Sequence, residues 1–559
     1  MGDRIDRRSF LARSAAVGAG LAAAGSSGGL LAACSSNSGA SSSGSSATKG
    51  NGVTSATPRP GGQVIFGTEA EEKGFSPIAG TFDTTGILYA RTVFDPLAII
   101  AADGITVKPY LAESITPNAD YTTWTVTLRP NLLFHNGTPC DGAALLANFE
   151  AQKAAALTGP ALTTIDTMSQ TGPLAVTVNM SSPWVPFDYY LAGGIGGQVA
   201  FIAEPKWLNS NPPDQTNPIG TGPFVFQSWT PNDHFTATKN PHYWRSGLPY
   251  LDSITYKPIP DAQQLYSSLE VGNVDMMHTS EAQVTGQLKS SSFSFIDDVD
   301  HVAGEPDMGC LLLNSAKAPF NNLKVRQAAA MAVSSAQYVS VIDAGGLNVP
   351  ASGPFPSGSP YYAPTGYPTP DVAKAKQLIQ EVKQETGQPV SISVGHTPDA
   401  NTTKIAEYIQ AQFQNIGVQS TLSSVQQASL INDALLGSFE CLVWRQFGAV
   451  DPDLNYIFWS PTEINAVYSI NMARNTDPAM QTALLKGRQS SNPADRAAAY
   501  QEVGRLMGSD LPYVWLDRAV WSIGAAPKVQ NFNNPTAPDG SGAFGMITGA
   551  IWPTQIWVN

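Results

Sequence analysis

Short apolar runs alternate with amphipathic helical patterns through the second half of the chain, and this alternation constrains the fold more than any other feature. The apolar runs are residues 310–313, 390–394 and 441–444, and the helical patterns are residues 324–333, 371–385, 402–415 and 493–507. Strands and helices that alternate in this way form a sheet with helices packed against it. The pattern therefore predicts α/β layers.

Strand signals also occur in the first half of the chain. Residues 61–67 form a short apolar run, residues 124–129 alternate apolar and polar side chains, and residues 223–237 read as two strands around a turn. Residues 143–153 carry helical spacing after the expected cap Asp141. At about 100–200 residues per domain, a chain of 559 residues corresponds to about three structural units.

The net charge argues against one class of partner. The chain has 44 acidic and 31 basic residues, so its formal charge is −13. A negative protein is repelled by phosphate backbones, and nucleic acid is not an expected partner.

The first sixty residues predict export. Arg7 and Arg8 precede a weakly apolar stretch, residues 15–31, which contains no acid and ends in Leu-Ala-Ala-Cys at Cys34. The paired arginines resemble a twin-arginine signal, and the sequence around Cys34 resembles a lipoprotein box. The alternative is an ordinary secretory signal in which the cysteine falls there by chance. We expect residues 1–33 to be removed, Cys34 to carry the lipid, and residues 34–60 to form a flexible Ser/Gly tether.

Three cysteines remain after lipidation of Cys34, namely Cys140, Cys310 and Cys441. They allow at most one disulfide, whose pairing cannot be read from the sequence. Cys310 and Cys441 lie in apolar runs, where a free buried thiol is the commoner outcome.

Sequence patterns for catalysis, metals and cofactors give no candidate residues. None of the six histidines has the spacing of a zinc site, and neither a nucleophile elbow nor a phosphate loop occurs in the mature chain. Residues 540–545 match Gly-x-Gly-x-x-Gly, but no room follows for a crossover helix and a second strand. Residues 451–462 lack the glycine and glutamate of a calcium loop. We expect no enzyme activity, no metal and no cofactor.

Six ordered motifs resemble the family 5 extracellular solute-binding proteins, which deliver peptides, nickel and related ligands to ABC importers. The most specific is WTVTLRPNLLFHNGTP at residues 124–139, which resembles W-x-x-x-L-R-x-G-V-x-F-H-D-G-x-P. The others are FDPL at 94–97, GTGPF at 220–224, YWRSGLPYLD at 243–252, GNVD at 272–275, and residues 314–332 with APF and VRQA. The matches run from about residue 61 to 333, with weaker ones to about 520.

The resemblance implies an α/β, two-lobed periplasmic-binding-protein-like fold of type II, with an extra subdomain and a ligand cleft between the lobes. Domain I then comprises residues 61–92, 217–311 and 518–559. Domain II, the inserted subdomain, spans residues 93–216, and domain III, the second lobe, spans residues 312–517. The chain is expected to cross between the lobes near residues 311–314 and 511–521.

The same resemblance implies a function without catalysis. The protein captures a peptide or a similar-sized organic solute and delivers it to an ABC permease with its ATPase subunits. We expect a monomer, attached by its lipid to the outer face of the cell membrane or held in the periplasm. The alternatives are a non-peptide ligand such as a sugar, an opine or a metal chelate, a sensory receptor on the same scaffold, and an exported hydrolase.

The position that binds the amine of a peptide is changed in this sequence. Family members that bind short peptides use an aspartate about three residues before an Asp-Pro pair to contact the α-amino group. Here Asp451 and Pro452 form that pair, and the expected aspartate position falls on Gly448. The amine contact is missing unless a shift of the loop lets Asp451 supply it.

The resemblance also implies a set of neighbouring candidates. Arg445 lies in a strand expected to face the cleft, where it pairs either with a ligand carboxylate or with a structural acid. Trp444 and Phe447 are either aromatic walls or core residues. Thr68 and Glu69 end the opening strand, where ligand-facing polar groups are expected. The full candidate ligand-binding set is Thr68, Glu69, Trp444, Arg445, Gln446, Phe447 and Asp451.

Overall fold

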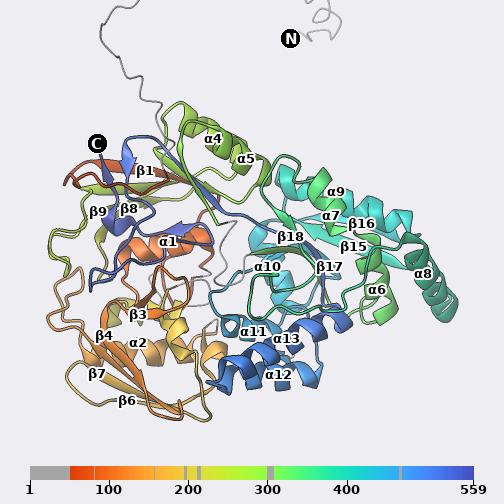
Figure 1. Ribbon diagram of the computed structural model, residues 1–559, viewed down its shortest axis with the longest axis horizontal. Coiled ribbons are helices and arrows are strands. Elements are labelled where there is room, and N and C mark those ends of the chain that lie inside the picture. Colours follow the sequence, from red (N-terminus) through yellow and green to blue (C-terminus); the bar gives the residue numbers. More distant parts are fainter. Residues whose placement is uncertain are drawn as a thin grey trace, which may run out of the picture. The chain divides into compact units, whose positions relative to one another are not determined.

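Three sheets contain most of the strands in the computed structural model (Figure 1). The structure describes residues 51–559 except 73, 81, 157, 194–197, 211–215, 299–306 and 465–468. The predicted export signal, with Arg7, Arg8 and Cys34, lies outside the described residues, as does the first part of the predicted tether. Within the described ranges, no helix combines the length and the apolarity that a membrane crossing requires.

A seven-stranded sheet collects strands from distant parts of the chain. Its order is β12 (Ser294–Asp297), β19 (Ser522–Ala525), β11 (Met276–Thr279), β1 (Gln63–Thr68), β10 (Ser253–Pro258), β9 (His234–Lys239) and β8 (Phe224–Thr230). Strand β1 lies at its centre, parallel to both β10 and β11. The helices α1 (Thr84–Val93), α4 (Ala262–Glu270) and α5 (Ala282–Ser290) belong to this part of the molecule.

A six-stranded sheet contains most of the second half. Its order is β14 (Val349–Pro350), β18 (Tyr513–Arg518), β13 (Met308–Leu313), β17 (Cys441–Gln446), β15 (Ser391–His396) and β16 (Gln419–Ser424). Its helices are α6 (Leu323–Ala332), α7 (Ser335–Val341), α8 (Val372–Thr386), α9 (Ala400–Asn415), α10 (Gln427–Leu436), α11 (Tyr456–Trp459), α12 (Pro478–Gln489) and α13 (Pro493–Asp510).

Both faces of the six-stranded sheet are buried, which explains why its strands read as continuous apolar runs. Successive side chains of a strand point to opposite faces. In β13, Leu311 and Leu313 therefore join the core with α6, α8 and α9, whereas Cys310 and Leu312 join the core with α10, α12 and α13 (Figure 1).

A four-stranded antiparallel sheet forms the third layer, in the order β4 (Ala112–Pro117), β5 (Thr123–Leu128), β7 (Ala175–Met180) and β6 (Ile165–Gln170). It packs with α2 (Gly142–Ala154), which Asp141 caps as predicted. The remaining elements are α3 (Pro205–Leu208) and the short pairs β2 (Ala98–Ile100) with β3 (Val107–Pro109), β20 (Val529–Gln530) with β23 (Trp557–Val558), and β21 (Met546–Ile547) with β22 (Ala550–Ile551).

The chain passes between the seven-stranded and six-stranded sheets twice. The first passage lies between β12 and β13, and the second is the short segment of residues 519–521 between β18 and β19. The boundary expected at residue 311 falls inside β13, and the first crossing comes before residues 311–314. The second crossing lies within the expected range.

Two further expectations can be compared with the structure. Cys140, Cys310 and Cys441 are buried free thiols, so no disulfide links the described cysteines. The strand expected over residues 61–67 begins at Gln63, because Gly61 and Gly62 have φ angles of 105° and 83°, in a region that favours glycine.

Candidate ligand-binding site

Two parallel strands of the seven-stranded sheet end at the same edge and place Glu69 beside Ser280. Glu69 follows β1 and Ser280 follows β11, its neighbour in the sheet. The Ser280 hydroxyl lies 3.4 Å from Glu69 Oε2. Carboxyl ends of neighbouring parallel strands are a common location for ligand sites, because the loops that follow them diverge.

A buried histidine fixes the backbone at this edge. The Glu69 amide donates to His278 Nε2 at 3.2 Å, and His278 Nδ1 lies 3.2 Å from the carbonyl oxygen of Gly549. These two contacts require a neutral ring with its proton on Nδ1. Burial lowers the pKa of His278 to about 4, so the ring remains neutral at physiological pH.

Arg445 reaches this edge from the six-stranded sheet. It lies on β17, and its Nη1 donates to Ser280 Oγ at 2.6 Å. The guanidinium carbon also lies 5.6 Å from the centre of the Trp521 ring. Arg445 and Glu69, two residues of the predicted set, are therefore brought together from different sheets.

A glycine keeps space open on the strand beside Arg445. Gly309 of β13 lies opposite Arg445 of β17 on one side and opposite Asp517 of β18 on the other. A Cβ at position 309 would collide with the Asp517 carboxylate. The glycine thus allows the Asp517 side chain to lie over the middle strand, toward Arg445.

Asp307 adds another carboxylate next to the position where the family's amine contact was expected. It precedes β13 and is 2 % exposed. Its Oδ1 accepts a hydrogen bond from the backbone N–H of Gly448, and its Oδ2 accepts one from Trp521 Nε1 at 2.8 Å. The carboxylate therefore bridges the segment after β17 and the second crossing segment.

The charges around Arg445 are unbalanced. Burial alone would lower the pKa of Arg445, but attraction by Glu69, Asp307 and Asp517 outweighs it and raises the pKa. Burial raises the pKa of Glu69 to about 7, and it also raises the pKa values of Asp307 and Asp517. Among the residues that the structure describes, one arginine thus faces three carboxyl groups, and additional positive charge would stabilise their ionised forms.

Strand alternation separates Arg445 from Trp444 and Gln446. Trp444 packs against the core on the opposite face of the six-stranded sheet, and Gln446 donates to Asn455 Oδ1 at 3.1 Å on that face. Thr68 is fully buried, and its hydroxyl donates to the carbonyl of Ala70 at 2.9 Å. The structure does not place these three side chains with the charged group around Arg445.

The last two predicted residues lie on the segment after β17. Phe447 packs against the core of the seven-stranded sheet, and its ring centre lies 5.8 Å from that of Phe458. Asp451 forms two hydrogen bonds with Arg496, at 2.8 and 2.9 Å, and it is 2 % exposed. The carboxylate of Asp451 thus already has a cationic partner within the protein.

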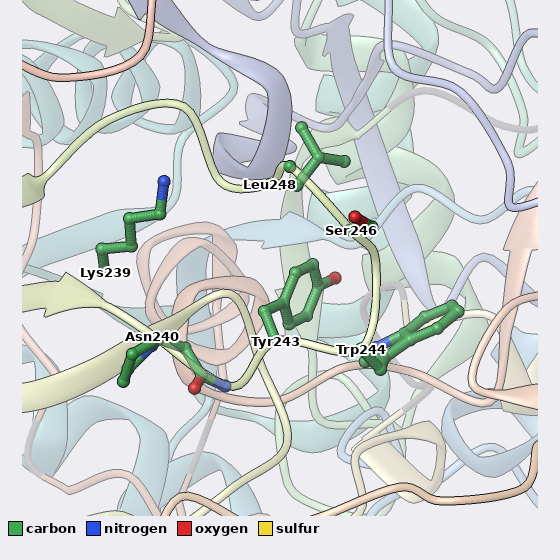
Figure 2. A pocket seen from close by; sticks show the side chains of 8 residues that line it. Lys239, Asn240, Tyr243, Trp244, Ser246 and Leu248 are labelled. Carbon is green, nitrogen blue, oxygen red and sulfur yellow. The ribbon is translucent and has the colours of Figure 1, made fainter.

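A separate hollow lies in the loop after β9, within the YWRSGLPYLD motif. It encloses about 360 Å³ and is lined by Lys239, Asn240, Tyr243, Trp244 and Leu248 among others (Figure 2). Tyr243 and Trp244 both donate to Asp95, at 3.1 and 2.6 Å, which ties this loop to the FDPL motif. These contacts indicate a structural role for both motifs.

Metal binding has no support in the part of the chain that the structure describes. No group of three or more His, Cys, Asp or Glu side chains there is arranged to hold a metal ion.

The sheets and their connections define a fold of the periplasmic-binding-protein type. Its fold matches that of AgaA from A. tumefaciens R10, solved with agropinic acid, with a TM-score of 0.77, 22 % identity and coverage of 89 % of this chain and 99 % of that one. It also matches AppA from Bacillus subtilis, solved with a nonapeptide, with a TM-score of 0.77, 19 % identity and coverage of 90 % and 100 %. These matches confirm the predicted fold class.

The chain belongs to the bacterial extracellular solute-binding proteins of family 5, whose middle model matches residues 106–466. Among curated relatives, it is 27 % identical to the nickel-binding periplasmic protein of Escherichia coli K12 over 501 residues, covering 84 % of this chain and 92 % of the relative. It is 26 % identical to the glutathione-binding protein GsiB of Salmonella paratyphi A over 455 residues, covering 77 % and 84 %. The chain is a substrate-binding protein of an ABC importer, as its motifs predicted.

Proposed function

We propose that this importer component captures an organic solute with a positively charged amine, of the size of a short peptide, between its seven-stranded and six-stranded sheets. The observation that carries the proposal is the convergence of Glu69, Asp307 and Asp517 on a single arginine. A cationic ligand group would balance these carboxylates, whereas a ligand carboxylate would be repelled by them. Arg445 then acts as an internal counter-ion rather than as the anchor for a ligand carboxylate.

The backbone of β17 supports an extended, peptide-like ligand. On the side of β15, only Cys441 and Leu442 have register partners. Residues 443–446 have no described strand beside them on that side. An extended ligand can add to such an edge through main-chain hydrogen bonds, while side-chain pockets select its residues.

Asp307 is the best candidate for the amine contact. Its carboxylate touches the backbone of Gly448, the position at which the family's aspartate was expected. The hydrogen bonds from Gly448 and Trp521 leave Asp307 with further acceptor capacity, because an ionised carboxylate has about four lone-pair sites. Asp451 is a poorer candidate, since Arg496 already binds both of its oxygens.

The remaining features of the proposal concern delivery. The relatives include proteins named as periplasmic, which supports export of this chain. We extend the proposal to a monomer without catalytic activity, which is anchored through Cys34 and releases its ligand to a permease.

Calorimetry with two related peptides tests the amine requirement. The purified protein, freed of bound ligand by partial unfolding and dialysis, is titrated at pH 7.5 with Ala-Ala-Ala and with its N-acetylated form. We expect the free-amine peptide to bind about tenfold more tightly or better, as charge-assisted hydrogen bonds predict. Equal affinity, or a preference for the acetylated peptide, would contradict the proposal.

Two variants locate the contact. Asp307→Asn should remove most of the preference for the free amine, whereas Asp166→Asn should leave it unchanged because Asp166 is exposed on β6. Circular dichroism and thermal unfolding check that both variants are folded. Full retention of the preference by a folded Asp307→Asn variant would exclude Asp307 as the amine contact.

A further inference from the structure

A small cavity lies within the core on the face of the six-stranded sheet opposite Arg445. It encloses about 10 Å³, and the side chains around it include those of Trp459 of α11, Asn471, Met480 of α12, Met507 of α13 and Tyr513 of β18. Each of these five residues is between 1 % and 3 % exposed. The cavity therefore belongs to the interior of the molecule.

The Asn471 side chain has a buried acceptor without a partner. Its Nδ2 group donates to the carbonyl oxygens of Trp459, Ser460 and Asn475, at 3.4, 3.1 and 3.2 Å. A reversed amide would place its oxygen against these three carbonyl oxygens, so the positions of nitrogen and oxygen are fixed. Among the described residues, no group donates to the buried Oδ1 atom of Asn471.

Trp459 has a buried donor without a partner at the same cavity. Its indole Nε1 makes no hydrogen bond with the part of the chain that the structure describes. Burial raises the pKa of Tyr513, whose protonated hydroxyl lies beside the Trp459 indole, but the two groups do not have the geometry of a hydrogen bond. Buried polar groups without partners are rare and unfavourable, so two of them at one cavity indicate an occupant that satisfies both.

The chemistry of these two groups limits what can occupy the cavity. An indole N–H only donates hydrogen bonds, and an amide oxygen only accepts them. A cation cannot accept from Trp459 and an anion cannot donate to Asn471, whereas a hydroxyl group does both. The volume of about 10 Å³ is close to the smallest that holds one water molecule, so larger hydroxyl compounds do not fit.

We propose that this cavity is a binding site for one buried water molecule. The water accepts a hydrogen bond from Trp459 Nε1 and donates one to Asn471 Oδ1. The hydroxyl of Tyr513 is its third partner, since a phenol group both donates and accepts. Buried waters with about three such partners are part of the folded structure. This water links α11, the segment before α12 and strand β18, whichever solute the protein transports.

A high-resolution crystal structure of the mature protein tests the site directly. We expect one ordered water within hydrogen-bond distance of both Trp459 Nε1 and Asn471 Oδ1. An empty cavity, a larger occupant, or a direct hydrogen bond from the Trp459 indole to Tyr513 would overturn the proposal. Trp459→Phe keeps an aromatic ring and removes the donor, so the electron density of the water should weaken or disappear in a crystal of this variant.

Solution NMR of the unsubstituted protein gives a second readout. With isotope-labelled tryptophan, the indole proton of Trp459 should exchange magnetisation with a water molecule that stays bound for longer than the protein takes to tumble. Trp184 is the matched control, because its indole is also buried and donates to Asp453 at 2.9 Å. If the Trp459 indole shows no more contact with water than the Trp184 indole does, the proposal is wrong.

Discussion

Two buried arginines connect the six-stranded sheet and its helices to neighbouring parts of the molecule, and their surroundings differ. Arg488 of α12 binds Asp453 through Nε at 2.9 and 3.1 Å, and it also donates to Thr164 and Tyr190 of the four-stranded part. Trp184 donates to the same aspartate at 2.9 Å. Arg488 thus forms its ion pair with one buried carboxylate, Asp453.

Among the described residues, Arg445 donates one hydrogen bond, to Ser280, and faces three carboxyl groups. Both arginines are buried, so burial of a charge is not enough to identify a ligand site. The balanced pair of Arg488 and Asp453 holds two parts of the molecule together, whereas we propose that the unbalanced cluster around Arg445 receives a charge from the ligand.

The largest expected effect comes from a substitution that breaks the ion pair of Arg488 and Asp453. Arg488→Met leaves Asp453 buried without its cation, and we expect a loss of about 3–5 kcal/mol in the free energy of unfolding. Chemical denaturation measures this loss. Arg445→Met should cost clearly less, because its carboxyl neighbours can take up protons; an equal loss would remove the distinction between the two sites.

A smaller loss is expected from filling the space at Gly309, over which the Asp517 side chain lies. Gly309→Ala would push a methyl group into the Asp517 carboxylate, and we expect a loss of about 1–3 kcal/mol in stability from the collision. Affinity for a free-amine peptide should also fall by about tenfold or more, since Asp517 is displaced. Gly172→Ala is the control, because a Cβ there meets only an ordinary contact with Ala175 at 3.4 Å and Gly172 does not have a positive φ.

The next largest expected effect is a change in ligand affinity with pH at the Arg445 cluster. Glu69 has a pKa raised to about 7, so it is largely protonated at pH 5.5 and mostly ionised at pH 7.5. A cationic ligand favours the ionised form, and its affinity should therefore rise about tenfold over this range. Calorimetry at several pH values measures the slope. Glu69→Gln should flatten it, and an unchanged slope in this variant would assign the titration to another group.

The smallest expected effect concerns the hydrogen bond between Arg445 and Ser280. Ser280→Ala removes the acceptor at 2.6 Å from Nη1, and we expect a change of about 0.5–1.5 kcal/mol in stability. Thermal and chemical unfolding measure it. A loss as large as that of Arg488→Met would show that Arg445 also serves mainly as a structural clamp.

Much of the fold followed from the sequence because its signals are local. Strand β5, the paired strands β8 and β9, and the capped helices α2 and α8 lie where periodicity and capping residues placed them. Helices such as α10 and α12 were not predicted from local pattern. The structure shows where the chain passes between the two large sheets, and the predicted domain bounds themselves stay a prediction.

The sequence predicted only part of the candidate site. Glu69 and Arg445 were identified through the resemblance, and alternation within β17 could have shown that Trp444 and Gln446 point away from Arg445. Asp307 and Asp517 were missed because they come from distant parts of the chain, just before β13 and within β18, with no shared motif. An acid that directly follows the apolar residues 513–516 of strand β18 was a signal for Asp517, but only the sheet register shows what lies beside it.

The second crossing segment gives the molecule an optical property of its own. Trp521 lies in the linker between the two sheets, its indole N–H binds Asp307, and its backbone N–H binds Asp298 at 2.8 Å. An indole loses or gains fluorescence when its hydrogen bond and the charge beside it change. Binding of an amine at Asp307 should therefore alter the fluorescence emission of Trp521, which lies in the segment that connects the two sheets. Occupancy could then be followed in real time without a label, with Trp521→Phe as the silent reference.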